Sequence, residues 1–396
     1  CNDERAKTKI FTTENLKIAR DAATKSFVLL KNTRLPGQEN NLLPLKKSGT
    51  IAVIGPLADA KENMAGTWSV ATKQENSISL IAGINSVVGN SAKILYAKGS
   101  NLDYDAALEE RATMFGKTLH RDNRTTEELL SEALKIANQA DVIVAALGES
   151  AEFSGECSSR TNLEIPQAQK DLLQALLKTG KPVVLVLFDG RPLVITDENK
   201  TVPAILNVWF AGSEAGYAIA DVLFGNENPS GKLTTTFPRS VGQIPIYYAV
   251  KNTGRPLGNK EGVFEKFKSN YIDERNEPLF PFGFGLSYTS FDYSNLRLSS
   301  AVMNANETLK ASVDITNTGN FDGKEVVQLY IRDITGSVVR PVKELKGFQK
   351  IRLKKGESKQ VQFVLTANDL RFYNDQLQYI YEPGKFKLYI GGNSRD

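Results

Sequence analysis

Glutamates recur at short spacing in the segment Leu147–Gln169, which contains Glu149, Glu152 and Glu156. The apolar run Asp141–Leu147 precedes them and is typical of a buried strand. A loop at the end of a strand commonly carries the catalytic groups of an α/β protein, because the sheet holds the loop in place. Carboxyl groups there can transfer protons, so this segment is our candidate active-site loop.

Glu156 is the side chain best suited to donate a proton. A general acid needs a raised pKa and room to approach the leaving oxygen, and Glu156 follows Gly155 among small side chains. Glu149 directly follows the strand, so its side chain should lie close to the sheet and be partly buried. The alternative is that Glu149 and Glu156 are structural and bind loop amides or Arg160. Spacing alone does not decide between these interpretations.

Trp68, in the sequence Gly66-Thr-Trp68-Ser69, is a candidate for binding a sugar ring. An indole face packs well against the apolar side of a sugar, and tryptophans on loops after strands often serve this purpose. The alternative is that Trp68 fills an interface between domains.

Other chemistries have little support. His120 is the only histidine and no GxSxG motif occurs, which argues against a Ser-His-Asp hydrolase. The segment Gly225–Lys232 only approximates a phosphate-binding loop, because its glycines are spaced too far apart and Leu233 replaces the magnesium-binding Ser or Thr. We therefore interpret it as a turn and expect no nucleotide.

The two cysteines, Cys1 and Cys157, have no CxxC spacing, so we expect no structural zinc, no other metal site and no cofactor. They are compatible with a disulfide or with two unrelated thiols. The first residues resemble the interior of a protein and carry no export signal, so we expect the chain to be a fragment.

The composition indicates a soluble protein of several domains, with 396 residues of which 41% are apolar and 24% charged. Its net charge of +4 is spread over 49 basic and 45 acidic side chains, which argues against nucleic-acid binding. No apolar run approaches the roughly 20 residues that span a membrane.

Periodicity predicts the elements that position the loop. A helix with N-cap Thr13 should run to Lys31–Asn32, and a sheet of buried strands should follow. Expected strands are Ile51–Gly55, Lys93–Ala97, Asp141–Leu147, Val183–Phe188 and Ala204–Phe210, and expected helices are Glu127–Ala140, Gln167–Lys178 and Glu214–Leu223. Continuous apolar strands separated by helices predict a doubly wound parallel sheet covered on both faces.

The C-terminal part alternates polar and apolar residues at period two in Leu309–Asn317, Glu325–Arg332, Ser358–Leu365 and Lys385–Gly391. Such strands predict a fibronectin-like antiparallel β-sandwich. The preceding Pro229–Leu286 reads as an irregular strap over the seam between the domains, with Tyr247, Tyr248 and Tyr271 burying their rings. The expected divisions are 1–48 (linker helix and lead-in), 49–235 (α/β sandwich), 236–290 (strap) and 291–396 (fibronectin type III-like domain).

Several motifs together resemble glycoside hydrolase family 3, and in particular its bacterial periplasmic β-glucosidases. The likeness covers essentially the whole chain and is carried by Arg20–Asn32, Leu42–Leu45, Ile51–Asp59, Gly66–Ser69, the glutamate loop, Lys181–Leu193, Trp209–Gly216, and the motifs NPSGKL, FPRSVGQIP and PFGFGLSYTSF.

The resemblance implies a retaining β-glucosidase that removes terminal β-D-glucose, with an N-terminal (β/α)8 barrel supplying an aspartate nucleophile. It assigns the general acid/base to Glu156, and more loosely a sugar contact to Trp68. The Ser-Asp-Trp-type nucleophile motif is absent here, so we expect this chain to be inactive without its barrel domain. Partners would be that domain and a β-glucoside, with a homo-oligomer left open and no nucleic acid or membrane span. A β-xylosidase and a non-catalytic carbohydrate-binding module remain alternatives, and periplasmic residence rests on the resemblance alone.

Overall fold

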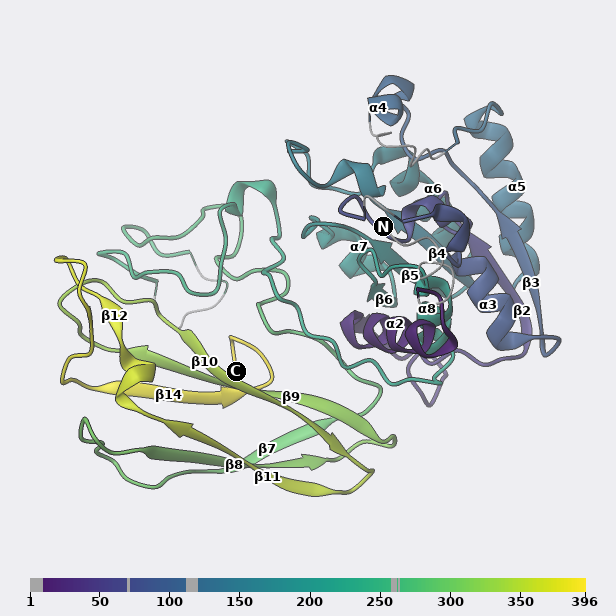
Figure 1. Ribbon diagram of the computed structural model, residues 1–396. Helices are drawn as coiled ribbons and strands as arrows, with labels where there is room; N and C mark the ends of the chain where they lie inside the picture. Colours follow the sequence, from purple (N-terminus) through teal and green to yellow (C-terminus); the bar gives the residue numbers. More distant parts are fainter. Residues whose placement is uncertain (1–9, 70–71, 112–119, 258–261, 263) are drawn as a thin grey trace. The chain divides into compact units, whose positions relative to one another are not determined.

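The computed structural model describes residues 10–69, 72–111, 120–257, 262 and 264–396, and the chain divides into two units, Cys1–Gly231 and Lys232–Asp396 (Figure 1). The first unit alternates strands and helices around one sheet. Its helices are α2 Thr13–Ser26, α3 Leu80–Val88, α4 Ala106–Arg111, α5 Thr126–Gln139, α6 Gln167–Lys178, α7 Thr196–Thr201 and α8 Ala215–Leu223, with the 3-10 turns η1 Lys61–Asn63, η2 Gln74–Asn76 and η3 Ala151–Phe153.

The sheet of this unit has the strand order β1-β6-β5-β4-β2-β3. Five strands are parallel, and β1 pairs antiparallel with β6. The parallel-dominated α/β fold is therefore confirmed. The strands are β1 Val28–Asn32, β2 Gly49–Ile54, β3 Ala92–Ala97, β4 Val142–Gly148, β5 Val183–Phe188 and β6 Ala204–Asn207.

Helices cover both faces of the sheet. The connection from β2 to β3 through α3 and the connection from β3 to β4 through α5 cross the sheet in opposite directions, so right-handed crossovers place α3 and α5 on opposite faces. The packing agrees with this, because α3 and α2 contact α8, whereas α5 contacts α6 (Figure 1). The direction reverses between β2 and β4, and the loops that follow these two strands therefore meet at the switch point of the sheet.

The first helix is shorter than the sequence predicts. Its N-cap is Thr12, whose hydroxyl accepts the Asn15 N–H at 3.2 Å, and it ends at Ser26. The next residues form β1, which pairs antiparallel with β6 and is itself the edge strand of the sheet, and Phe27–Leu30 are buried. A short apolar run fits a helix face or a buried strand equally well, and here pairing with an open sheet edge favoured the strand.

The other predicted elements of this unit match closely, with α6 and β5 bounded as expected, although β6 ends at Asn207 rather than Phe210. The expected helix over Glu127–Ala140 is α5, and a reciprocal capping box between Thr125 and Glu128 starts it one residue earlier. Helix α3 was not predicted, although Ser79 caps it.

The second unit contains two three-stranded antiparallel sheets, β10-β9-β14 and β11-β8-β7, and confirms the predicted antiparallel β fold. Its apolar core includes Val313, Leu329 and Phe363. The elements are η4 Val241–Gln243, β7 Phe291–Leu298, β8 Leu309–Asn317, β9 Gly323–Asp333, β10 Glu344–Leu353, β11 Ser358–Leu365, η5 Ala367–Leu370, β12 Phe372–Tyr373, β13 Tyr379–Ile380 and β14 Phe386–Gly391.

Strands β7 and β10 were missed for a local reason. Each contains a register shift, between Ser294 and Arg297 in β7 and between Leu345 and Gly347 in β10. An irregularity of this kind interrupts the two-residue alternation by which strands are recognised.

The segment Pro229–Leu286 is irregular, as predicted, and η4 is the only named element in the described part of it. That it covers a seam between the domains stays a prediction. Within the second unit, the Tyr248 ring stacks on Phe282 at 4.4 Å, and its hydroxyl accepts the Leu345 N–H at 3.3 Å. The prediction of buried rings is wrong for Tyr247 and Tyr271, which are 56% and 40% exposed.

Candidate active site

The candidate site lies at the carboxyl ends of the neighbouring parallel strands β2 and β4. The loop after β2 carries Trp68, and the loop after β4 carries Glu149, Glu152 and Glu156. Two contacts join these loops. Asn63 Oδ1 accepts the Ala151 N–H at 2.6 Å, and the Thr67 hydroxyl donates to Glu152 Oε2 at 3.1 Å. The tertiary structure thus brings Trp68 and Glu156 into two adjoining loops.

Glu149 is a fully buried structural carboxylate. Its Oε1 lies 2.7 Å from Arg160 Nη1 and 3.3 Å from Arg191 Nε, and its Oε2 accepts the Gly190 N–H at 3.4 Å. A buried charge persists when it is paired and hydrogen-bonded, and this carboxylate meets both conditions. The structural alternative, including the pairing with Arg160, therefore describes Glu149.

Glu152 is also buried, with 9% of its surface exposed, and it is held by Thr67. Glu156, in contrast, is exposed on the turn between Ser154 and Ser158. Of the three carboxylates, Glu156 is the one that an external molecule can approach.

The turn depends on Gly155, whose φ of 124° lies in a region that side chains rarely adopt. A Cβ atom at this position would lie 2.6 Å from Thr67 Cγ2. The absence of a side chain therefore allows the Trp68 loop and the Glu156 turn to approach closely.

Trp68 is 72% exposed. The alternative that it fills an interface is not realised within the first unit, since most of the indole remains open. Trp209, the other tryptophan, donates its Nε1–H to the Ser26 carbonyl at 3.2 Å and has a φ of 53°.

Sequence reasoning missed Asp189, which directly follows β5 and is fully buried. Burial and the negative charge of nearby Glu149 raise the pKa of the Asp189 carboxyl well above its usual range, and a weaker interaction with Asn207 opposes this shift. The Asp189 carboxyl therefore holds its proton to higher pH than a solvent-exposed aspartate does. The sequence Asp189-Gly190-Arg191 after an apolar strand was the available signal for this cluster.

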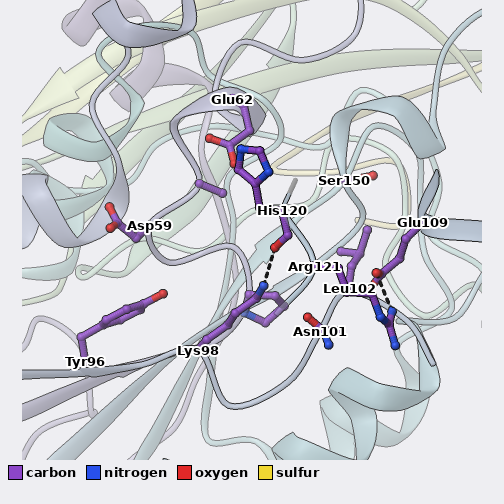
Figure 2. Close-up of a pocket in the computed structure, with 12 residues that line it drawn as sticks. Asp59, Glu62, Tyr96, Lys98, Asn101, Leu102, Glu109, His120, Arg121 and Ser150 are labelled. Carbon is purple, nitrogen blue, oxygen red and sulfur yellow. Dashed lines mark hydrogen bonds and ion pairs between the residues drawn. The ribbon is translucent and has the colours of Figure 1, made fainter. Parts of the chain in front are cut away.

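A pocket of about 190 Å³ opens at the same edge of the sheet and is lined from the loops after β2, β3 and β4. Figure 2 shows Lys98 reaching the His120 carbonyl, at 2.7 Å, and Arg121 paired with Glu109 at 2.5 Å. Burial lowers the pKa of Lys98, and it raises the pKa of Glu62, whose carboxyl lies beside the His120 ring. Much of this lining is thus committed to internal contacts.

The other candidate groups are the cysteines, clusters of metal-binding side chains and Lys232, of which all but Cys1 lie among the described residues. Cys157 is an exposed free thiol, whereas Cys1 lies outside them. Within the same residues no cluster of three His, Cys, Asp or Glu side chains forms a metal site. Lys232, from the segment resembling a phosphate-binding loop, instead contacts Glu325 Oε1 at 3.0 Å and the Gly285 carbonyl at 2.8 Å. No described helix is long and apolar enough to cross a membrane.

The chain matches the model of the glycosyl hydrolase family 3 C-terminal domain over residues 27–288 and that of a fibronectin type III-like domain over 325–394. It belongs to glycosyl hydrolase family 3. The resemblance inferred from the motifs is thus confirmed.

Among curated relatives, the chain is 51% identical to a periplasmic β-glucosidase of Salmonella typhimurium, over 96% of this chain and 48% of that protein. It is 39% identical to a β-xylosidase of Formosa agariphila, over 97% and 49%. Among solved structures, a β-glucosidase from Listeria innocua in complex with isofagomine is 37% identical with a TM-score of 0.86, over 98% and 50%. The chain therefore spans about half the length of these relatives.

Proposed function

We propose that this chain forms the acid/base half of a retaining, exo-acting β-glucosidase that releases terminal non-reducing β-D-glucosyl residues, and that Glu156 is its general acid/base. The observation that carries the proposal is the contrast among the three carboxylates. Glu149 and Glu152 are buried and bonded, whereas Glu156 is exposed beside the loop of Trp68. Family membership and the β-glucosidase relatives support the substrate class.

In this mechanism Glu156 first protonates the leaving glycosidic oxygen. As a carboxylate it then removes a proton from the water that cleaves the glycosyl-enzyme. Trp68 offers an exposed aromatic face for a sugar ring. Retaining hydrolysis also needs a nucleophilic carboxylate about 5–5.5 Å from the acid, and we assign this group to a (β/α)8 barrel domain. The chain alone is then inactive, and turnover of an aryl β-glucoside by the 396-residue chain would contradict this assignment.

The direct test uses a chimera in which this chain replaces the half of the Salmonella typhimurium enzyme that it matches. With a dinitrophenyl β-glucoside, whose leaving group needs no acid, Glu156→Ala should still form the glycosyl-enzyme and then hydrolyse it slowly. Azide, which needs no base, should restore turnover and yield β-glucosyl azide. Rescue of Glu152→Ala without rescue of Glu156→Ala would show that the wrong carboxylate was assigned.

Two alternative functions can be tested with the same chimera. The Formosa agariphila relative is named a β-xylosidase, so the sugar is tested by comparing kcat/KM of the chimera and of the parent enzyme on aryl glucoside and aryl xyloside. A non-catalytic carbohydrate-binding role would instead give a chimera that binds glucose and fails to turn over either substrate. Periplasmic residence is part of the proposal and rests on the name of the Salmonella relative.

A further inference from the structure

The loop after β4, which carries Glu156, and the loop after β5 are joined by one buried carboxylate. Glu149, at the end of β4, is paired with Arg160 from its own loop and with Arg191 from the loop after β5. Gly190 strengthens the joint, because its N–H binds Glu149 and a Cβ there would lie 2.1 Å from Ser154 Oγ. The loop after β5 therefore packs directly against the loop that carries Glu156.

Arg191 holds that loop on both sides of Glu156. Its Nη2 donates to the carbonyl of Phe153, before the turn, and to the carbonyl of Ser158, after it, the latter at 2.7 Å. A planar guanidinium presents several N–H donors in a fixed arrangement, so it can fix two carbonyls relative to each other. Glu149 pairs with this guanidinium by charge, since its Oε1 lies 3.3 Å from Arg191 Nε, although Nε itself makes no hydrogen bond within the described residues.

The turn has little regular support of its own. Its backbone passes through Gly155 at a φ of 124° and Cys157 at 58°, and a non-glycine residue with positive φ is strained. Its internal hydrogen bonds are long, since the Ser158 N–H reaches the Gly155 carbonyl at 3.3 Å and the Ser158 hydroxyl reaches that of Glu156 at 3.3 Å. Such a conformation persists when surrounding contacts impose it, and Arg191 supplies two of them.

We propose that Arg191 is the positioning residue for Glu156. This inference rests on the proposed acid/base role of Glu156. Glu149 anchors Arg191, and Arg191 sets the ends of the turn from which the Glu156 carboxyl projects. Without this arginine the carboxyl is displaced from the glycosidic oxygen, and displacements of about 1 Å cost on the order of 10²-fold in rate.

The test is Arg191→Met in the chimera, which removes both carbonyl contacts and leaves Glu149 paired with Arg160. For a phenyl glucoside, whose leaving group needs the acid, kcat/KM should fall about 10²-fold. For a dinitrophenyl glucoside the glycosylation rate should stay within about threefold of the parent. Azide should restore turnover of the dinitrophenyl glucoside by this variant, and the KM for both glucosides should change little.

The matched control is Arg20→Met. Arg20 makes a bidentate, partly buried ion pair with Asp221 at 2.5 and 2.7 Å, which joins α2 to α8 without touching the loop. This variant should lower the melting temperature and affect both glucosides alike. Hydrogen exchange of the 150–160 amides should speed up in Arg191→Met and remain unchanged in Arg20→Met.

The conservative variant Arg191→Lys keeps one cation able to reach one carbonyl, and it should recover part of the lost activity on the phenyl glucoside. It also serves as the test if Arg191→Met does not fold. Absence of azide rescue in Glu156→Ala would mean that the proposed function is wrong. Rescue of Glu156→Ala together with a leaving-group-independent loss in the Arg191 variants would overturn the positioning role alone.

Discussion

The Thr67 hydroxyl donates a hydrogen bond to Glu152 Oε2 at 3.1 Å, and the methyl group of the same side chain lies where a side chain at residue 155 would have to be. These two contacts connect the loop after β2 to the loop after β4 at the switch point of the sheet. Because Trp68 follows Thr67 and Glu156 follows Gly155, the same joint positions both candidate site residues.

The joint itself can be tested with Thr67→Val, which keeps the shape of the side chain and removes its hydroxyl. Loss of a hydrogen bond to a buried carboxylate should lower the free energy of unfolding by about 1.5–3 kcal/mol, measured by urea unfolding of the chain. Thr67→Ser keeps the hydroxyl and should lose less. A valine variant as stable as the parent would show that the hydrogen bond does not contribute.

Replacing Trp68 with alanine should weaken substrate binding, whereas replacing Trp209 with alanine should lower stability. Trp68 is 72% exposed, so Trp68→Ala should change the free energy of unfolding by less than about 0.5 kcal/mol and should raise KM for glucosides in the chimera. Trp209→Ala removes an indole that is hydrogen-bonded to Ser26 and should destabilise the chain. A strong loss of stability in Trp68→Ala of the isolated chain, with unchanged KM in the chimera, would argue for a structural role of Trp68.

The raised pKa of Asp189 predicts a pH-dependent stability. The unfolded chain releases this proton near pH 3.9, whereas the folded chain, with Glu149 beside the carboxyl, retains it to higher pH. The unfolded state therefore binds fewer protons between these two pKa values, and stability falls as pH rises through that window.

Asp189→Asn removes the ionisable carboxyl and with it this pH-dependent contribution to stability. Its stability relative to the parent should increase with pH above about 4, by about 1.4 kcal/mol per pH unit until the folded pKa is reached. Urea unfolding of both proteins from pH 4 to pH 8 measures the difference. A difference independent of pH would show that the carboxyl has a similar pKa in both states.

Lys232 should contribute strongly to the stability of the second unit. Its ammonium pairs with Glu325, which also accepts the Tyr293 hydroxyl at 3.1 Å, and the lysine and glutamate side chains are 14% and 6% exposed. Lys232→Met leaves the glutamate charge buried without its cation and should cost about 3–5 kcal/mol in calorimetric unfolding of this unit. The double variant Lys232→Met/Glu325→Gln should recover part of the loss. Equal stability of the single variant and the parent would contradict the prediction.

Much of the fold could be predicted because its signals are local. The apolar runs of β4 and β5, the amphipathic pattern of α6 and the alternation in β8 and β11 lie within single elements. Phe27–Leu30, in contrast, were predicted wrongly as helix, because an apolar run of this length does not distinguish a helix from a strand. The open edge of β6, to which β1 adds, is formed by residues far away in the chain.

For the candidate site, the sequence by itself determined the loop, its carboxylates, the preference for Glu156 and the choice of Trp68. The tertiary structure decided which carboxylates are buried, since Glu149 meets Arg160 and Arg191 and Glu152 meets Thr67. It also revealed the burial of Asp189 and the hydrogen bonds from Arg191 to the carbonyls of Phe153 and Ser158. The physical reason is that residue type and spacing specify what chemistry a side chain can do, whereas its charge state and position depend on neighbours brought in from other strands.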